Sequence, residues 1–109
     1  MEKVYNKLVR DNIPNIIKNN GGEPFTRILT DEEYKIELEK KLYEEYNEVL
    51  NTKNTEERIE ELADMIEIIS SLALVEGKNL DVVLECAKKK CIKRGGFEKK
   101  IYLEKVIED

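Results

Sequence analysis

The 109-residue sequence contains no histidine and no tryptophan, and it has only two prolines and two cysteines. Without histidine, the ligand sets of most zinc enzymes and of ferritin-like di-iron bundles are excluded. Aromatic residues make up 6% of the chain, whereas charged residues make up 39%. This composition favours a helix-rich fold over a β-sandwich or β-barrel.

The sequence also lacks any apolar run long enough to cross a membrane, and Met1 begins no signal sequence. The two cysteines, Cys86 and Cys91, are five residues apart and match no metal or redox motif. We expect buried, reduced thiols, a cytoplasmic location and no membrane partner.

Charge is distributed unevenly. The net charge is −5, which argues against a general nucleic-acid binder. Residues 31–50 carry eight acids against three bases, and residues 56–76 carry seven acids against one base. Residues 78–105 carry nine bases against four acids. An acidic middle and a basic tail suit a protein that binds metal with one part and phosphate with another, although solvated helix faces are the alternative.

Apolar spacing and capping residues predict an all-α, antiparallel helical bundle in a single domain of residues 1–109. Thr30 opens a capping box, and Thr55 and Asn79 can cap two later helices. The predicted helices span about 31–50, 56–76 and 80–94, with a short one over 14–18. Short extended segments are expected near 25–29 and 97–103.

Two pairs of acids flank the break near Asn54. Glu45 and Glu48 precede it, and Glu61 and Asp64 follow it. Residues three apart share one face of a helix, so each pair points in one direction. Symmetric folding of the hairpin would place Glu45 opposite Asp64, and Glu48 opposite Glu61.

These acids conflict with the helix pattern. At about 100° per residue, Glu45 and Glu61 lie within the apolar stripes of their helices. Ionised carboxylates that face a core are costly unless they are paired or bound to metal. Surface acids are common, so a solvated face is the alternative, but the mirrored conflict favours a site.

All-carboxylate ligands favour Mg²⁺, Mn²⁺ or Ca²⁺, and no calcium-binding loop pattern is present. Mg²⁺ is usually bound together with substrate phosphates. Lys90 and Arg94 share a face at the end of the basic helix, and Lys41 lies four residues before Glu45. These bases are candidates for phosphate contacts, with complementation of the helix dipole as the alternative for the C-terminal ones.

The four acids resemble the signature of the MazG-like, all-α nucleoside triphosphate pyrophosphohydrolases, in which Glu-x-x-Glu is followed by Glu-x-x-Asp. The segments 6–14 and 90–97 look like the phosphoribosyl-ATP pyrophosphohydrolase-like subgroup. The resemblance covers most of the chain.

It implies Mg²⁺-dependent hydrolysis of a nucleotide substrate between the α- and β-phosphates, with Mn²⁺ as a possible substitute. It also implies homodimers or homotetramers whose neighbouring subunits complete the site. The metal ligands would be Glu45, Glu48, Glu61 and Asp64. Glu48 is our candidate for the general base, with Glu45 and Lys41 also catalytic.

The resemblance further implies that Lys7, Arg10 and Asp11 close over the nucleotide. A salt-bridged N-terminal arm is the alternative for these three residues. For the whole protein the alternatives are the phosphoribosyl-ATP pyrophosphohydrolase of histidine biosynthesis, a non-catalytic nucleotide-binding module, and a structural helical oligomer.

Overall fold

The computed structural model describes residues 1–108, and within that range it contains helices and no strand. The helices are α1 (Ile13–Asn19), α2 (Asp31–Leu50), α3 (Thr55–Val75) and α4 (Leu80–Arg94). The prediction of an all-α fold is confirmed, and the bounds of α2 and α4 are as the capping residues indicated. The segments 25–29 and 97–103 form neither strand nor helix.

Side-chain caps explain where the long helices begin. The Thr30 hydroxyl accepts a hydrogen bond from the Glu33 amide at 3.2 Å, and the Glu33 carboxylate accepts one from the Thr30 amide at 3.1 Å. This reciprocal pair is the predicted capping box of α2. Helix α3 is capped by Asn54 and not, as expected, by Thr55. Asn54 is the stronger capping residue of the two, and its side chain reaches the Glu57 amide at 2.9 Å.

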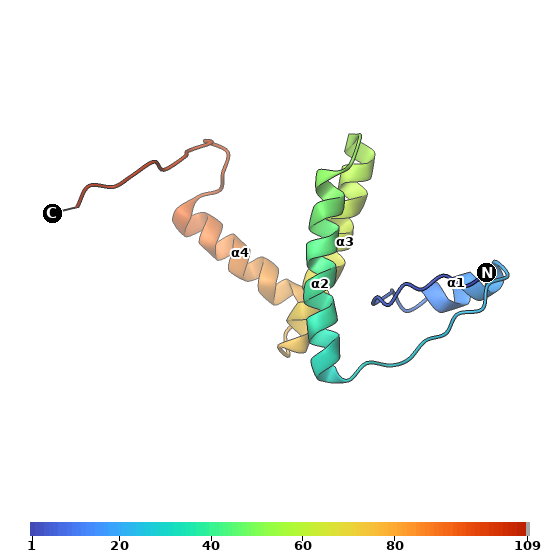
Figure 1. Cartoon of the computed structure of the whole chain (residues 1–109). Helices are drawn as coiled ribbons and strands as arrows, with labels where there is room; N and C mark the ends of the chain where they lie inside the picture. Colours follow the sequence, from blue (N-terminus) through green and yellow to red (C-terminus); the bar gives the residue numbers. More distant parts are fainter. Residues whose placement is uncertain (109) are drawn as a thin grey trace.

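A short turn folds α3 back along α2, so the two helices run antiparallel and side by side (Figure 1). The Val49 carbonyl at the end of α2 accepts hydrogen bonds from the Thr52 hydroxyl at 2.9 Å and from the Arg58 guanidinium at 3.1 Å. These bonds satisfy a carbonyl that the helix itself leaves without a partner. The turn and the first residues of α3 are thereby fixed to α2.

The seam of this hairpin is the core. Leu38 and Val49 on α2, and Ile68 and Ala73 on α3, are the buried apolar residues of the described chain. Helices α2 and α3 make the most extensive packing in the structure. The hairpin is therefore the rigid frame on which other features are placed.

Helix α4 turns away from the hairpin (Figure 1). Gly77 has a φ of +75°, and the Lys78 amide donates to the Ala73 carbonyl at 2.9 Å, which together end α3 in a Schellman motif. Among the described helices, α4 packs only against α3. Both Cys86 and Cys91 lie on it as free thiols, but they are exposed. Our expectation of buried thiols was wrong, because among the described helices only α3 packs against α4 and both thiols remain exposed.

The chain is open. Its radius of gyration is 18.8 Å, whereas a compact domain of this length has about 13 Å. Many large apolar side chains are exposed, among them Phe97 at 96% and Ile92 at 79%. The C-terminal segment extends away from the helices (Figure 1). In residues 1–108, no helix is both long and apolar enough to span a membrane.

Candidate metal centre

The apolar seam of the hairpin is interrupted by carboxylates. Glu45 lies seven residues after buried Leu38 and four before buried Val49, and Glu61 lies seven residues before buried Ile68. Positions seven or four apart lie on one face of a helix. The same helical periodicity that buries the leucine, valine and isoleucine therefore turns both glutamates toward the opposite helix.

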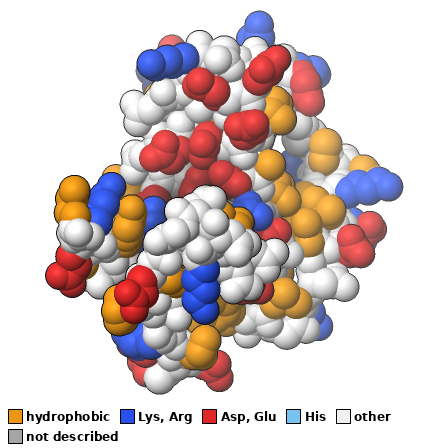
Figure 2. Space-filling view, turned by 90° about the vertical axis from the view of Figure 1, so that its right-hand side faces the viewer, with side chains coloured by type: hydrophobic (Ala, Val, Ile, Leu, Met, Phe, Trp, Pro, Cys, Tyr) orange, Lys and Arg blue, Asp and Glu red, His pale blue; other side chains and the backbone are white. Residues whose placement is uncertain are grey.

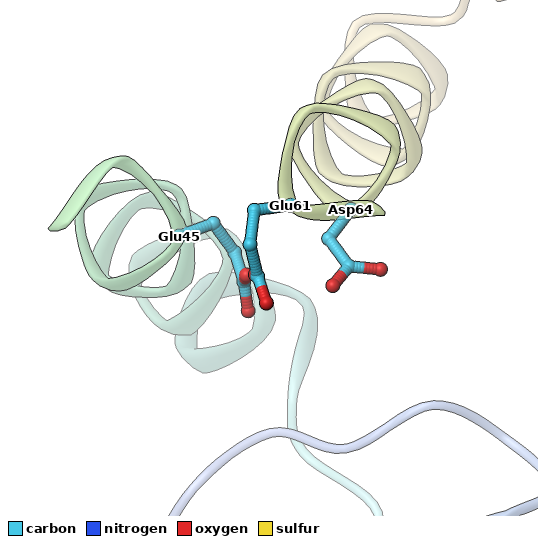
Figure 3. A group of neighbouring side chains, drawn as sticks. All are labelled: Glu45, Glu61 and Asp64. Carbon is cyan, nitrogen blue, oxygen red and sulfur yellow. The ribbon is translucent and has the colours of Figure 1, made fainter. Parts of the chain in front are cut away.

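Three carboxylates meet there. Glu45, Glu61 and Asp64 each offer an oxygen atom, and these oxygen atoms lie within 4.8 Å of one another. In Figure 3 the side chain of Glu45 comes from α2 and lies beside that of Glu61, while Asp64, one turn further along α3, points to the same side. All three residues are half-buried. We call this group the acid triad.

Negative charge is crowded in the acid triad. The pKa of Glu61 is raised to about 7 by a hydrogen bond shared with the Glu45 carboxyl, by burial, and by the charges of Glu45, Asp64 and Glu48. Carboxyl groups that crowd together cannot all ionise without cost. At neutral pH the triad therefore retains part of a proton, and a cation would replace it.

The pairing across the hairpin differs from the symmetric one that we expected. Glu61 lies against Glu45, and not against Glu48. The physical reason is the turn: α2 ends at Leu50 and α3 begins at Thr55, so the hairpin folds about Thr52 and Lys53. Facing positions are consequently closer in sequence than the mirrored acid pairs implied. Glu48 is exposed and stands outside the triad.

An open depression of about 380 Å³ contains the triad. Five acids and two lysines line it: Lys7, Lys41, Glu44, Glu45, Glu48, Glu61 and Asp64. Figure 2 shows acidic side chains gathered near the centre of the face that it presents. All four predicted metal ligands are thus brought to one depression, together with two of the predicted phosphate-binding bases.

One basic residue contacts the triad directly. The Arg10 guanidinium donates to Oδ1 of Asp64 at 2.7 Å, across 54 residues of sequence. Both side chains are substantially exposed, at 56% and 40%, and an exposed pair of this kind contributes about 0–1 kcal/mol. The alternative expectation of a salt-bridged N-terminal arm therefore holds for Arg10, one of the three residues to which it applied.

Other predicted residues lie apart from the acids. Lys90 and Arg94 are exposed on α4 and do not line the depression. Asp11 is exposed in the turn before α1 and is also outside it. The chain by itself therefore assembles the acidic part of the predicted site without its C-terminal bases.

Two features of the depression and its surroundings were not predicted from the sequence: the presence of Glu44 and the contact of Arg10 with Asp64. Glu44 was not among the predicted site residues, but it lines the depression, and its carboxylate lies 3.9 Å from the Lys41 ammonium. The spacing of three residues between them was a usable signal. The contact of Arg10 with Asp64 had no such signal, because it depends on how the N-terminal segment folds back.

The triad fits a divalent cation. Mg²⁺ binds oxygen at about 2.0–2.1 Å, so two ligand oxygens on one ion are at most about 4.2 Å apart. The separations of up to 4.8 Å between the triad oxygens need only small rotations of these half-buried side chains to reach this. Comparisons with protein-family models, with curated proteins and with solved structures find no match to this chain.

Proposed function

We propose that the protein is a Mg²⁺-dependent nucleoside triphosphate pyrophosphohydrolase, which cleaves the bond between the α- and β-phosphates to give a nucleoside monophosphate and pyrophosphate. The observation that carries the proposal is the convergence of Glu45, Glu61 and Asp64 in a depression that also holds two lysines. The resemblance of the acid pairs to the MazG-like pyrophosphohydrolases supports the same activity.

In this proposal Glu45, Glu61 and Asp64 hold the cation, with Glu48 available from the edge of the depression. Mn²⁺ has similar ligand preferences and is a substitute. A bound Mg²⁺ supplies neutralisation of phosphate charge and a lowered pKa of a bound water molecule. The remaining contributions come from side chains of the chain itself.

Glu48 suits the role of general base. It lines the depression but stands outside the triad, so its carboxylate is free to accept a proton from the attacking water. The Lys41 side chain is 19% exposed and lines the same depression. Together with Lys7, it is placed to stabilise negative charge that develops on the phosphates.

The site also needs a second copy of the chain in this proposal. Large apolar side chains on α4 and the C-terminal segment are exposed, which is unusual for a monomer. We propose a homodimer or homotetramer in which a neighbour covers these faces. The basic α4 and the acidic hairpin have opposite charge, so the contact would bring Lys90 and Arg94 toward the phosphates. Two free thiols agree with a cytoplasmic location.

The decisive experiment is a panel of nucleoside triphosphates and phosphoribosyl-ATP with Mg²⁺, with pyrophosphate and orthophosphate measured separately. We expect pyrophosphate and the monophosphate from at least one nucleotide. Glu48→Gln should abolish release while the fold is retained. Glu60→Gln is the matched control, because Glu60 is exposed and does not line the depression.

The outcomes separate the alternatives. Release of orthophosphate instead of pyrophosphate, or full activity of Glu48→Gln, would refute the proposal. Cleavage of phosphoribosyl-ATP alone would identify the histidine-biosynthesis enzyme. Metal-dependent nucleotide binding in calorimetry without any product would identify a nucleotide-binding module.

A further inference from the structure

The N-terminal segment, residues 1–12, reaches the hairpin at the acid triad. Among the described helices, α1 packs against none of the other three, so this segment and α1 stand beside the hairpin (Figure 1). The ion pair between Arg10 and Asp64 joins them to α3. In Figure 3 the pale blue N-terminal chain passes below the three carboxylates.

Arg10 contacts one of the acids that would bind a cation. Its guanidinium donates to Oδ1 of Asp64 at 2.7 Å, and Asp64 is one of the three residues whose oxygens converge. An oxygen lone pair that accepts this hydrogen bond is not available to a metal ion, which needs the lone pair itself. The guanidinium and a divalent cation therefore compete for the same carboxylate.

The competition favours the cation when it is present. The pair is exposed on both sides, and exposed ion pairs are weak because water and salt screen them. A divalent cation carries twice the charge and contacts several carboxylates at once. The arginine can hold the acids only while no such cation is bound.

We propose that Arg10 is a resident counter-ion of the acid triad, and that a divalent cation displaces it and releases the N-terminal segment from Asp64. This inference rests on the metal centre of the proposed function, but it does not require turnover. The same segment brings Lys7 to the rim of the depression. Displacement therefore frees the Arg10 guanidinium beside a depression that Lys7 also lines.

The first measurement is calorimetric titration of the metal-free protein with Mn²⁺ alone. Arg10→Gln removes the competitor and should tighten Mn²⁺ binding roughly two- to fivefold. An exposed ion pair contributes up to about 1 kcal/mol, which is about a fivefold change in a dissociation constant. Arg10→Lys, which retains the charge, should stay closer to the wild type. Lys3→Gln is the matched control, because it removes a charge from the same segment but lies over the Tyr5 ring, 5.1 Å from its centroid.

The second measurement follows the segment itself. The chain contains no tryptophan, so Tyr5→Trp introduces a single tryptophan, which can be excited selectively, five residues before Arg10. Addition of Mn²⁺ should lower its fluorescence anisotropy, and the added Arg10→Gln substitution should give the low value without metal. Unchanged anisotropy in both experiments would overturn the release of the segment.

Failure of this inference is distinguishable from failure of the proposed function. Equal or weaker Mn²⁺ binding by Arg10→Gln overturns the counter-ion role, even if nucleotides are cleaved. Tighter binding with no pyrophosphate from any nucleotide supports the counter-ion role and refutes the enzyme. Absence of Mn²⁺ binding in all variants overturns both the inference and the metal centre.

Discussion

Glu61 on α3 lies against Glu45 on α2, and a hydrogen bond shared between their carboxyl groups is the main cause of a Glu61 pKa near 7. Two helices that pack through apolar residues on either side thus meet at two acids. Because of this contact, the stability of the hairpin depends on pH and on bound cations, whereas that of a fully apolar seam would not.

The free energy of unfolding should fall as the pH rises from about 4.5 to about 7. The pKa of Glu61 is raised in the folded protein, from an ordinary value of 4.5 to about 7. In this window the folded state binds more protons than the unfolded state, so raising the pH favours unfolding. Denaturant titrations across this range measure the slope. Mg²⁺ should restore stability at pH 8 more than at pH 5.5, and equal effects at both would contradict the link.

Glu61→Gln should stabilise the metal-free protein at pH 8 by a few tenths to about 1 kcal/mol, the range typical of exposed charge pairs. The amide imitates the protonated acid, so the variant and the wild type should have similar stability near pH 5.5. Stabilisation by Mg²⁺ should be reduced, because a ligand is lost. Urea unfolding at both pH values provides the test, with Glu60→Gln as the control. Destabilisation at pH 8 would speak against charge crowding.

Thr30→Ala should lower the free energy of unfolding by about 1 kcal/mol, because it removes the N-cap of α2. Urea unfolding of the variant and the wild type measures the difference.

A hydrogen bond with Arg27 and one with the Thr30 backbone lower the pKa of Glu33 to about 2. The stability that Glu33 contributes is therefore present above pH 4.5 and lost as the pH falls toward 2. Glu33→Gln should remove this part of the acid sensitivity. An unchanged acid unfolding profile in that variant would contradict the prediction.

Ile92→Asp should shift the protein toward smaller assemblies. Ile92 is 79% exposed on α4, and a charge placed in a contact between copies would have to be desolvated. Sedimentation velocity over a concentration range measures the shift. Thr26→Asp adds the same charge at an exposed position between α1 and α2, and it should leave the distribution unchanged. If the wild-type protein is a monomer at all concentrations, the oligomer in our proposal is wrong.

Local signals were sufficient to predict the helices. The caps at Thr30 and Asn79, and the glycines at 77 and 95, lie within a few residues of the boundaries they determine. The carboxylates of the triad could also be predicted, because helical periodicity alone places Glu45 and Glu61 on apolar faces.

The remaining features depend on contacts between distant parts of the chain. The pairing of Glu61 with Glu45 depends on the length of the turn, which an assumed symmetry did not represent. The position of Arg10 on Asp64 depends on the path of a segment without regular structure. Exposure of Cys86 and Cys91 could not be predicted, because the apolar spacing on α4 is the same whether or not another element covers it.

The turn at Gly77 sets the direction in which helix α4 extends from the hairpin. Helix α4 has 15 residues, Leu80–Arg94, and is therefore about 22 Å long at 1.5 Å per residue. A rotation of about 30° at this turn would carry the far end through roughly 12 Å by the same geometry. Replacing Gly77 by a residue that disfavours its φ of +75° would therefore strain the backbone between α3 and α4. It would redirect the entire cluster of C-terminal positive charge.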